Sequence, residues 1–118
     1  MFYDYLVEDL IFCAEALKDR NMLLCLFGKA EIEFLIRDVI IGAAASLIVH
    51  GEIFWINNFT WSDTEKIYYP LMLKQGYLEA GKRVLPGNSK EFDVTFPTRK
   101  LLNFLIAHIK AKQSAKIC

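Results

Sequence analysis

Apolar and small residues recur at helical spacing between residues 30 and 50, the longest such stretch of the chain. From Val39 to Val49, Ser46 carries the only polar side chain, so a helix here would be apolar on every face. We therefore predict a central helix over 30–50 that is buried on nearly every side and ends at a left-handed Gly51. The small residues from Gly42 to Ser46 would let a neighbouring segment approach closely. The arc expected to face the core contains Ile32, Leu35, Ile36, Val39, Ala43, Ser46, Leu47 and His50.

Helical spacing also predicts a helix near each end of the chain. Residues 3–20 are apolar on one side and acidic on the other, which is typical of a surface helix. Residues 98–113 repeat this pattern with lysines on the polar side. A short apolar run at 22–27 is too brief for its spacing to distinguish a helical piece from an extended connector.

A capping box marks the start of a helix in the middle of the chain. In Ser62-Asp63-Thr64-Glu65 the serine can hold a free amide at the helix start, so a helix should begin near Asp63. Pro70 lacks the amide proton that a helix interior needs, so it should kink this helix or restart it as a helix over 70–81.

Two short segments have the composition or alternation of strands. Residues 53–56 are rich in β-forming side chains, and residues 92–96 alternate apolar and polar positions. A strong turn is predicted at 85–88. The chain should thus be one mainly α domain over 1–118, a compact bundle of four to five helices around 30–50, with a small β element in which 53–56 and 92–96 can pair.

Composition adds an expectation of exposed apolar surface. The chain has 118 residues, of which 54% are hydrophobic and 14% aromatic, a large share for a domain of this size to bury. A partner or a second copy of the chain would cover the surplus. The uncharged run from Val39 to Val49 is far shorter than the ~20 residues of a membrane span. The early acids Asp4, Glu8 and Asp9 are unlike a secretion signal, so we expect a cytoplasmic protein.

Charge is unevenly distributed along a chain whose formal net charge is zero. Acids predominate up to Glu65, and bases predominate from Lys82 onward. Either the two halves pack together and neutralise each other, or the acidic half offers a face to a basic partner. Without net positive charge, we do not expect a nucleic-acid partner.

No residue pattern predicts a metal or cofactor site. Cys13 and Cys25 lie among apolar neighbours and should act as small hydrophobic residues, and no cysteine has the spacing of a metal knuckle or redox pair. The dipeptides Gly28-Lys29 and Gly81-Lys82 lack the repeated glycines of a phosphate-binding loop. We predict no metal, no cofactor and no catalytic residues, and an enzyme is the less favoured reading.

An alternative function uses the two histidines. His50 and His108 could act as acid and base of a metal-free ribonuclease if they share a cleft. In the competing reading, His50 is a favourable cation at a helix C-terminus, and His108 borders the apolar stripe of the last helix.

The favoured hypothesis is a cytosolic protein-binding module, for example an inhibitor or immunity-type protein that neutralises a toxin or enzyme by occluding a basic site. Its partner surface would lie on the first helix, where two aromatic residues interrupt the acidic side. These aromatics either join the partner surface or are covered by a later segment. A homodimer is the remaining alternative. The predicted partner-binding residues are Tyr5, Glu8, Phe12, Glu15 and Asp19.

Overall fold

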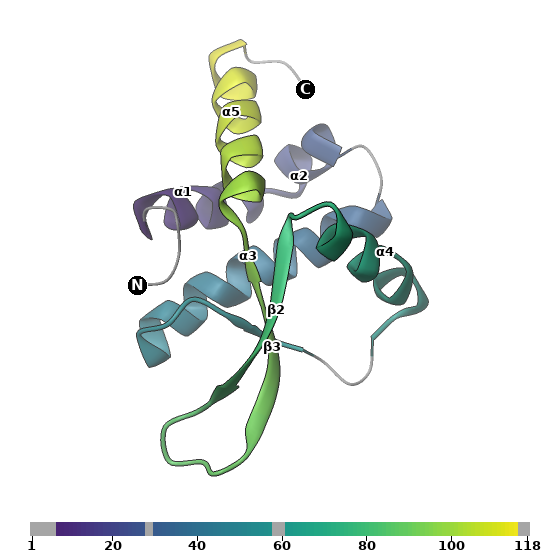
Figure 1. The fold of residues 1–118 in the computed structure, drawn as a ribbon. Helices are drawn as coiled ribbons and strands as arrows, with labels where there is room; N and C mark the ends of the chain where they lie inside the picture. Colours follow the sequence, from purple (N-terminus) through teal and green to yellow (C-terminus); the bar gives the residue numbers. More distant parts are fainter. Residues whose placement is uncertain (1–6, 28–29, 58–60, 116–118) are drawn as a thin grey trace.

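The computed structural model describes residues 7–27, 30–57 and 61–115 as a mainly helical fold with a small sheet (Figure 1). The described part holds five helices and three strands, as expected for a mainly α protein with a minor β element. In chain order these are α1 (Val7–Leu17), α2 (Arg20–Phe27), α3 (Ala30–His50), β1 (Trp55–Ile56), α4 (Asp63–Lys74), β2 (Leu78–Val84), β3 (Glu91–Pro97) and α5 (Arg99–Ala115).

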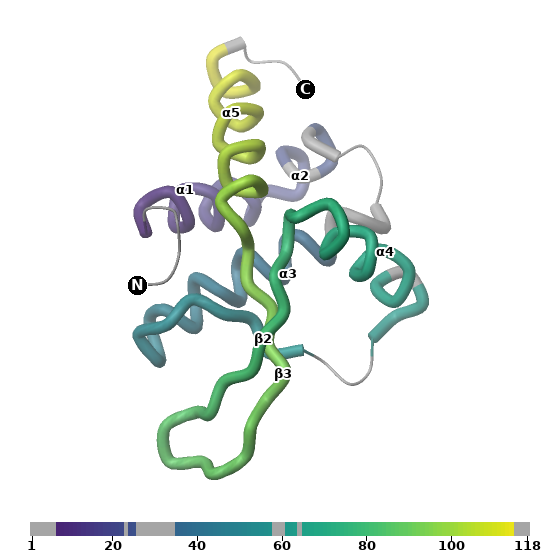
Figure 2. The backbone as a smooth tube through the Cα atoms, viewed as in Figure 1, coloured from purple at the N-terminus to yellow at the C-terminus, as the bar shows by residue number. Residues whose placement is uncertain are grey.

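The core forms where α3 is crossed by the other helices. Helices α1, α2 and α4 all pack on α3, while α5 packs on α1 and α2 (Figure 2). Helices α1, α3 and α5 contribute buried apolar residues at helical spacing, which places them on one face of each helix. The buried cluster comprises Leu10, Cys13, Ala14, Leu17, Leu35, Ile36, Val39, Ile40, Ala43, Ile53, Met72, Leu78, Leu101, Leu102, Leu105 and Ile109.

The three strands form an antiparallel sheet in the order β1-β3-β2. Trp55 pairs with Thr95 and Ile56 with Val94, which confirms that the predicted strands at 53–56 and 92–96 meet. Strands β2 and β3 form a long hairpin that projects away from the helices (Figure 1). Its turn lies at the predicted position: Gly87 has a φ of 78°, and the amide of Asn88 donates to the carbonyl of Leu85 at 3.1 Å.

Helix α4 begins as predicted but ends earlier. The Ser62 hydroxyl accepts a hydrogen bond from the Glu65 amide at 3.2 Å, and the helix continues through Pro70. The predicted helix over 70–81 is wrong beyond Lys74. Gly76 adopts a φ of 79°, a left-handed conformation that ends the helix, and the chain then enters β2. Helical spacing in this segment was outweighed by pairing with β3 across the hairpin.

Helix α3 has the predicted bounds, but its predicted burial on nearly every side is wrong at its C-terminal end. Ile48 and Val49 are 84% and 72% exposed. Helices α1, α2 and α4 pack on α3, and the segment 54–56 lies beside its C-terminal half. Gly51 closes the helix as predicted, with a φ of 72° and an amide that donates to the Leu47 carbonyl at 3.0 Å.

Residues 22–27 lie within helix α2, which resolves the ambiguity of that short run in favour of a helix.

The prediction that Cys13 and Cys25 act as small hydrophobic residues holds for Cys13, a free and buried thiol. It is wrong for Cys25, which is disulfide-bonded. Over the residues that the structure describes, none of the helices combines the length and apolar character needed to cross a bilayer.

Candidate functional site

An apolar groove lies between the C-terminal half of α3 and the segment 54–56. It has a volume of about 330 Å³, and none of the described residues that line it is Asp, Glu, Lys or Arg. One wall is the small-residue face of α3, and the other is the chain that leads into β1. The lining residues are Gly42, Ala45, Ser46, Val49, His50, Phe54, Trp55 and Ile56.

The small residues of α3 determine the shape of the groove. Residues 42, 45, 46 and 49 recur at a spacing that puts them on one helix face. Trp55 packs so closely on Gly42 that a Cβ at position 42 would overlap with the indole ring. The close approach predicted for this part of the helix is therefore made by a side chain.

Ser46 is a polar group without a partner in this apolar setting. Its hydroxyl oxygen is buried, and no described residue forms a hydrogen bond with it. A buried hydroxyl that lacks a partner costs roughly 1–3 kcal/mol relative to a satisfied one. At the rim, the His50 ring stacks on Phe54 at 5.8 Å between ring centroids. The groove therefore has an aromatic rim, whereas the Ser46 oxygen is not exposed to it.

Trp55 is held in place by further aromatic rings. It stacks against Trp61 at 6.3 Å, and Trp61 meets Tyr69 of α4 edge to face at 4.4 Å. The indole nitrogen of Trp61 is buried without a hydrogen-bond partner among the described residues. The row of rings connects the groove wall to α4 and limits the movement of Trp55.

A short hydrogen-bond chain fixes β1 to its neighbours. The Thr95 hydroxyl donates to Oδ1 of Asn57 at 2.6 Å, so the Tyr69 hydroxyl, at 2.8 Å, donates to Thr95. Thr95 is fully buried in β3. This chain joins β3, α4 and the residue that follows β1, and it sets the position of the strand wall.

Only some of the residues predicted to bind a partner at the first helix are exposed. Glu8, Glu15 and Asp19 are exposed, and Glu15 forms an ion pair with Lys18 at 2.8 Å. The Asp19 carboxylate accepts a hydrogen bond from the Asn21 amide in the first turn of α2. Tyr5 lies outside the described residues.

Phe12, the aromatic residue of that predicted surface, is half-buried against the core. The ammonium group of Lys110 from α5 lies 6.0 Å from its ring centroid. A later segment therefore covers much of Phe12, which was the alternative reading of its position. What remains exposed at this face is mainly its acidic groups.

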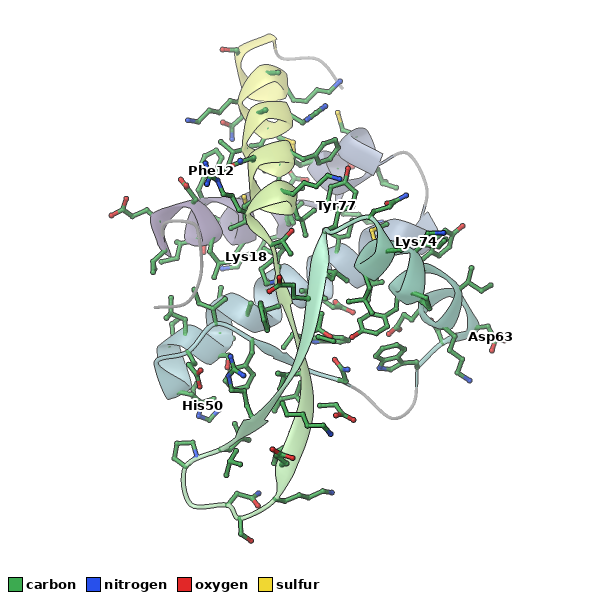
Figure 3. All side chains as sticks on the ribbon, in the orientation of Figure 1. Phe12, Lys18, His50, Asp63, Lys74 and Tyr77 are labelled. Atoms are coloured by element: carbon green, nitrogen blue, oxygen red, sulfur yellow. The ribbon has the colours of Figure 1, made fainter. Side chains whose placement is uncertain are left out.

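The two histidines occupy different parts of the fold. His50 lies at the hairpin end of α3, whereas α5 extends away from the hairpin (Figure 3). His108 stacks on Phe104 at 4.1 Å, and its Nδ1 lies 2.8 Å from the Phe104 carbonyl oxygen. His108 takes no part in the groove that His50 lines. The fold thus does not bring the two imidazoles together as the ribonuclease reading requires.

No group of three or more His, Cys, Asp or Glu side chains within 7–27, 30–57 and 61–115 has the arrangement needed to hold a metal ion. Burial, followed by the nearby Asp9 carboxylate, raises the pKa of Cys13 to about 12. This thiol is therefore protonated at neutral pH and is a poor nucleophile.

Sequence reasoning did not identify the groove, although one of its signals was visible. The small residues of α3 were recognised as a place of close approach, but the partner residue Trp55 could not be assigned from spacing. In comparisons with known proteins, no family model, no curated protein and no solved structure matches this chain.

Proposed function

We propose that this chain is a protein-binding module whose partner docks on the exposed end of α3 and the adjoining groove. The observation that supports this most directly is the exposure of Ile48 and Val49, at 84% and 72%. They are the two most exposed large hydrophobic residues in the described part of the chain. Ile56, which is 39% exposed, lies at the same groove as Val49. Adjacent exposed aliphatic residues beside an apolar groove are typical of a surface that a partner covers.

The test is a comparison of three charge substitutions. Ile48→Asp and Val49→Asp should abolish capture of the cellular partner, because a carboxylate would have to be desolvated in the interface. Ile67→Asp is the matched control, since Ile67 is a 61% exposed aliphatic residue on α4, away from the groove. Partner capture is measured by quantitative mass spectrometry, with helicity by circular dichroism as a folding check. A captured protein that is lost equally from all three variants would contradict the proposal.

The inhibitor hypothesis adds a second, electrostatic contact through α1. Glu8 and Glu15 remain exposed, so this face can meet a basic site on a toxin or enzyme. Reversing both charges to lysine should slow association with such a partner, with the largest effect at low ionic strength. Replacing both by glutamine separates the loss of attraction from new repulsion. If neither the lysine nor the glutamine substitutions change the association rate, α1 is not part of the interface.

A second copy of the chain is the alternative occupant of the α3 surface, and the formal net charge of zero offers no electrostatic barrier to it. Sedimentation at micromolar and nanomolar concentrations measures this directly. A dimer that dissociates in Val49→Asp and persists in Ile67→Asp would establish self-association. A monomer throughout leaves the surface to a foreign partner.

The proposed location is the cytoplasm, and the disulfide of Cys25 provides the test. Thiols in the cytosol are kept reduced. An alkylating reagent that is present during cell lysis should therefore label Cys25 before air can oxidise it. A Cys25 that is already oxidised in rapidly quenched cells would assign the chain to an oxidising compartment.

A further inference from the structure

The main chain of β1 has an open edge beside the groove. In antiparallel pairs, hydrogen-bonded and non-hydrogen-bonded residues alternate. The Asn57 amide donates to the Asp93 carbonyl at 3.0 Å, and Trp55 pairs with Thr95 two residues earlier. Ile56 lies between these two hydrogen-bonded positions. Its amide and carbonyl therefore point away from β3, toward the free edge of the sheet.

Within the described segments, neither main-chain group of Ile56 has a hydrogen-bond partner. Strand order confirms that β1 is an edge strand, as is β2. The two edges differ in their side chains. Strand β2 carries Glu79, Lys82 and Arg83, and charges of this kind discourage pairing with another strand. The segment 54–56 has no charged residue, so nothing on it opposes a further strand.

From this geometry we propose that the groove binds an extended peptide of the partner protein by strand addition to β1. The peptide would exchange main-chain hydrogen bonds with Ile56 and place one side chain between β1 and α3. Main-chain pairing supplies affinity in such complexes, and the side-chain pocket supplies selectivity. This inference rests on the proposed protein-binding function and names the form in which the partner is recognised.

The chemistry of the walls defines the peptide. A volume of about 330 Å³ with small residues at Gly42 and Ala45 accommodates a compact aliphatic side chain such as valine. The absence of charged groups among the described lining residues favours an uncharged segment. A peptide in which valine and threonine alternate meets both conditions.

A single extended chain fits this site better than a second copy of the protein. The groove is bounded by α3 on one side and by the strand segment on the other. Strand β1 of another copy is itself packed on α3 and paired with β3, so it cannot enter as an isolated strand. The occupant is therefore a segment that is extended or unfolded before binding, for which ordering is part of the binding free energy.

The test measures binding of a fluorescein-labelled Val-Thr-Val-Thr-Val peptide with blocked ends, by fluorescence anisotropy. Ile56→Pro removes the outward amide while keeping the Trp55 pairing, and proline is tolerated where an edge amide faces solvent. We expect Ile56→Pro to weaken binding by about tenfold or more. Ile56→Ala, which retains the amide, is the matched control. It should keep at least about one third of the wild-type affinity for the peptide.

Equal binding to wild type and Ile56→Pro would overturn strand addition, and so would no binding to wild type at millimolar peptide. If Ile56→Pro fails to fold, two measurements on the wild-type chain decide the matter. Hydrogen exchange at the Ile56 amide should slow when the peptide is added. A peptide that is N-methylated on the amides facing β1 should bind the wild-type chain about tenfold more weakly or worse, the same loss of affinity that is expected for Ile56→Pro. Unchanged exchange would contradict the inference.

The inference can fail without the proposed function failing. If Val49→Asp abolishes partner capture but Ile56→Pro does not, the partner docks through side chains on α3 and strand addition is wrong. If neither substitution affects capture while Ile67→Asp also has no effect, the α3 surface is not the interface, and the proposed function itself is wrong.

Discussion

Trp55 lies directly against Gly42, and a methyl group at position 42 would overlap with the indole ring. This contact joins the middle of α3 to the first residue of β1. It fixes the angle at which the strand leaves the helix and so keeps the two groove walls at a constant separation. Gly42 is therefore required for its lack of a side chain, since its backbone is helical like that of its neighbours.

A double-mutant cycle tests this contact. Gly42→Ala should destabilise the wild-type chain by about 1–3 kcal/mol, because the new methyl displaces the indole. In a Trp55→Ala background the same change should stabilise by up to about 1 kcal/mol, because alanine favours a helix more than glycine does. The free energy of unfolding is measured by urea titration. The same sign in both backgrounds would show that the indole moves aside without cost.

Thr95 should be more sensitive to loss of its hydroxyl than Tyr69. Thr95→Val leaves both Asn57 and Tyr69 without their shared partner, so it should cost about 1–3 kcal/mol. Tyr69→Phe removes one bond and should cost about 1 kcal/mol. Thr95→Ser keeps the hydroxyl and serves as the control for the lost methyl group. A smaller loss for Thr95→Val than for Tyr69→Phe would mean that the hydroxyl chain does not support β1.

Cys13 should resist alkylation as long as the chain is folded. Burial is the larger cause of its raised pKa of about 12, so very little thiolate is present at pH 8. Iodoacetamide should label Cys13 only after urea unfolding, as read by peptide mass spectrometry. With the disulfide of Cys25 reduced, Cys25 provides an internal comparison in the same sample. Rapid labelling of Cys13 without denaturant would show that α1 opens frequently.

Asp38 should make stability fall as pH rises. Partial burial and then repulsion from Glu65 raise the pKa of Asp38, while Arg37 lowers it. The folded chain therefore holds this proton more tightly than the unfolded chain. Stability is lost as pH rises from the ordinary pKa of 3.8 through the raised folded value.

Replacing the carboxylate tests the assignment. Asp38→Asn should increase the free energy of unfolding at neutral pH and flatten its dependence on pH across that window. Because Asp38 keeps contact with solvent, we expect a modest gain. Arg37→Gln should act in the opposite direction by removing the favourable charge. Urea titrations at several pH values measure both variants. A stability that rises with pH equally in all three proteins would contradict the assignment.

Local signals in the sequence predicted most of the elements. The bounds of α3, the cap at Ser62, the turn at Gly87 and the pairing of β1 with β3 all follow from interactions within a few residues or from strong alternation. Such signals act on the backbone directly and do not depend on what packs later.

The errors arose where distant contacts decide. Residues 78–81 have helical spacing, yet β3 lies across the hairpin and draws them into a strand. Ile48 and Val49 have the character of core residues, yet the described elements that pack on α3 leave both exposed. The groove depends on Trp55 meeting Gly42, a contact between two elements that no periodicity within either one can reveal.

The far half of the β2–β3 hairpin extends beyond the helices, and residues 86–91 at its turn are all exposed. Loop tips of this kind accept inserted sequence with little effect on the rest of a domain. A purification tag or a small fluorescent reporter placed between Gly87 and Asn88 would thus be a practical handle for immobilising the protein.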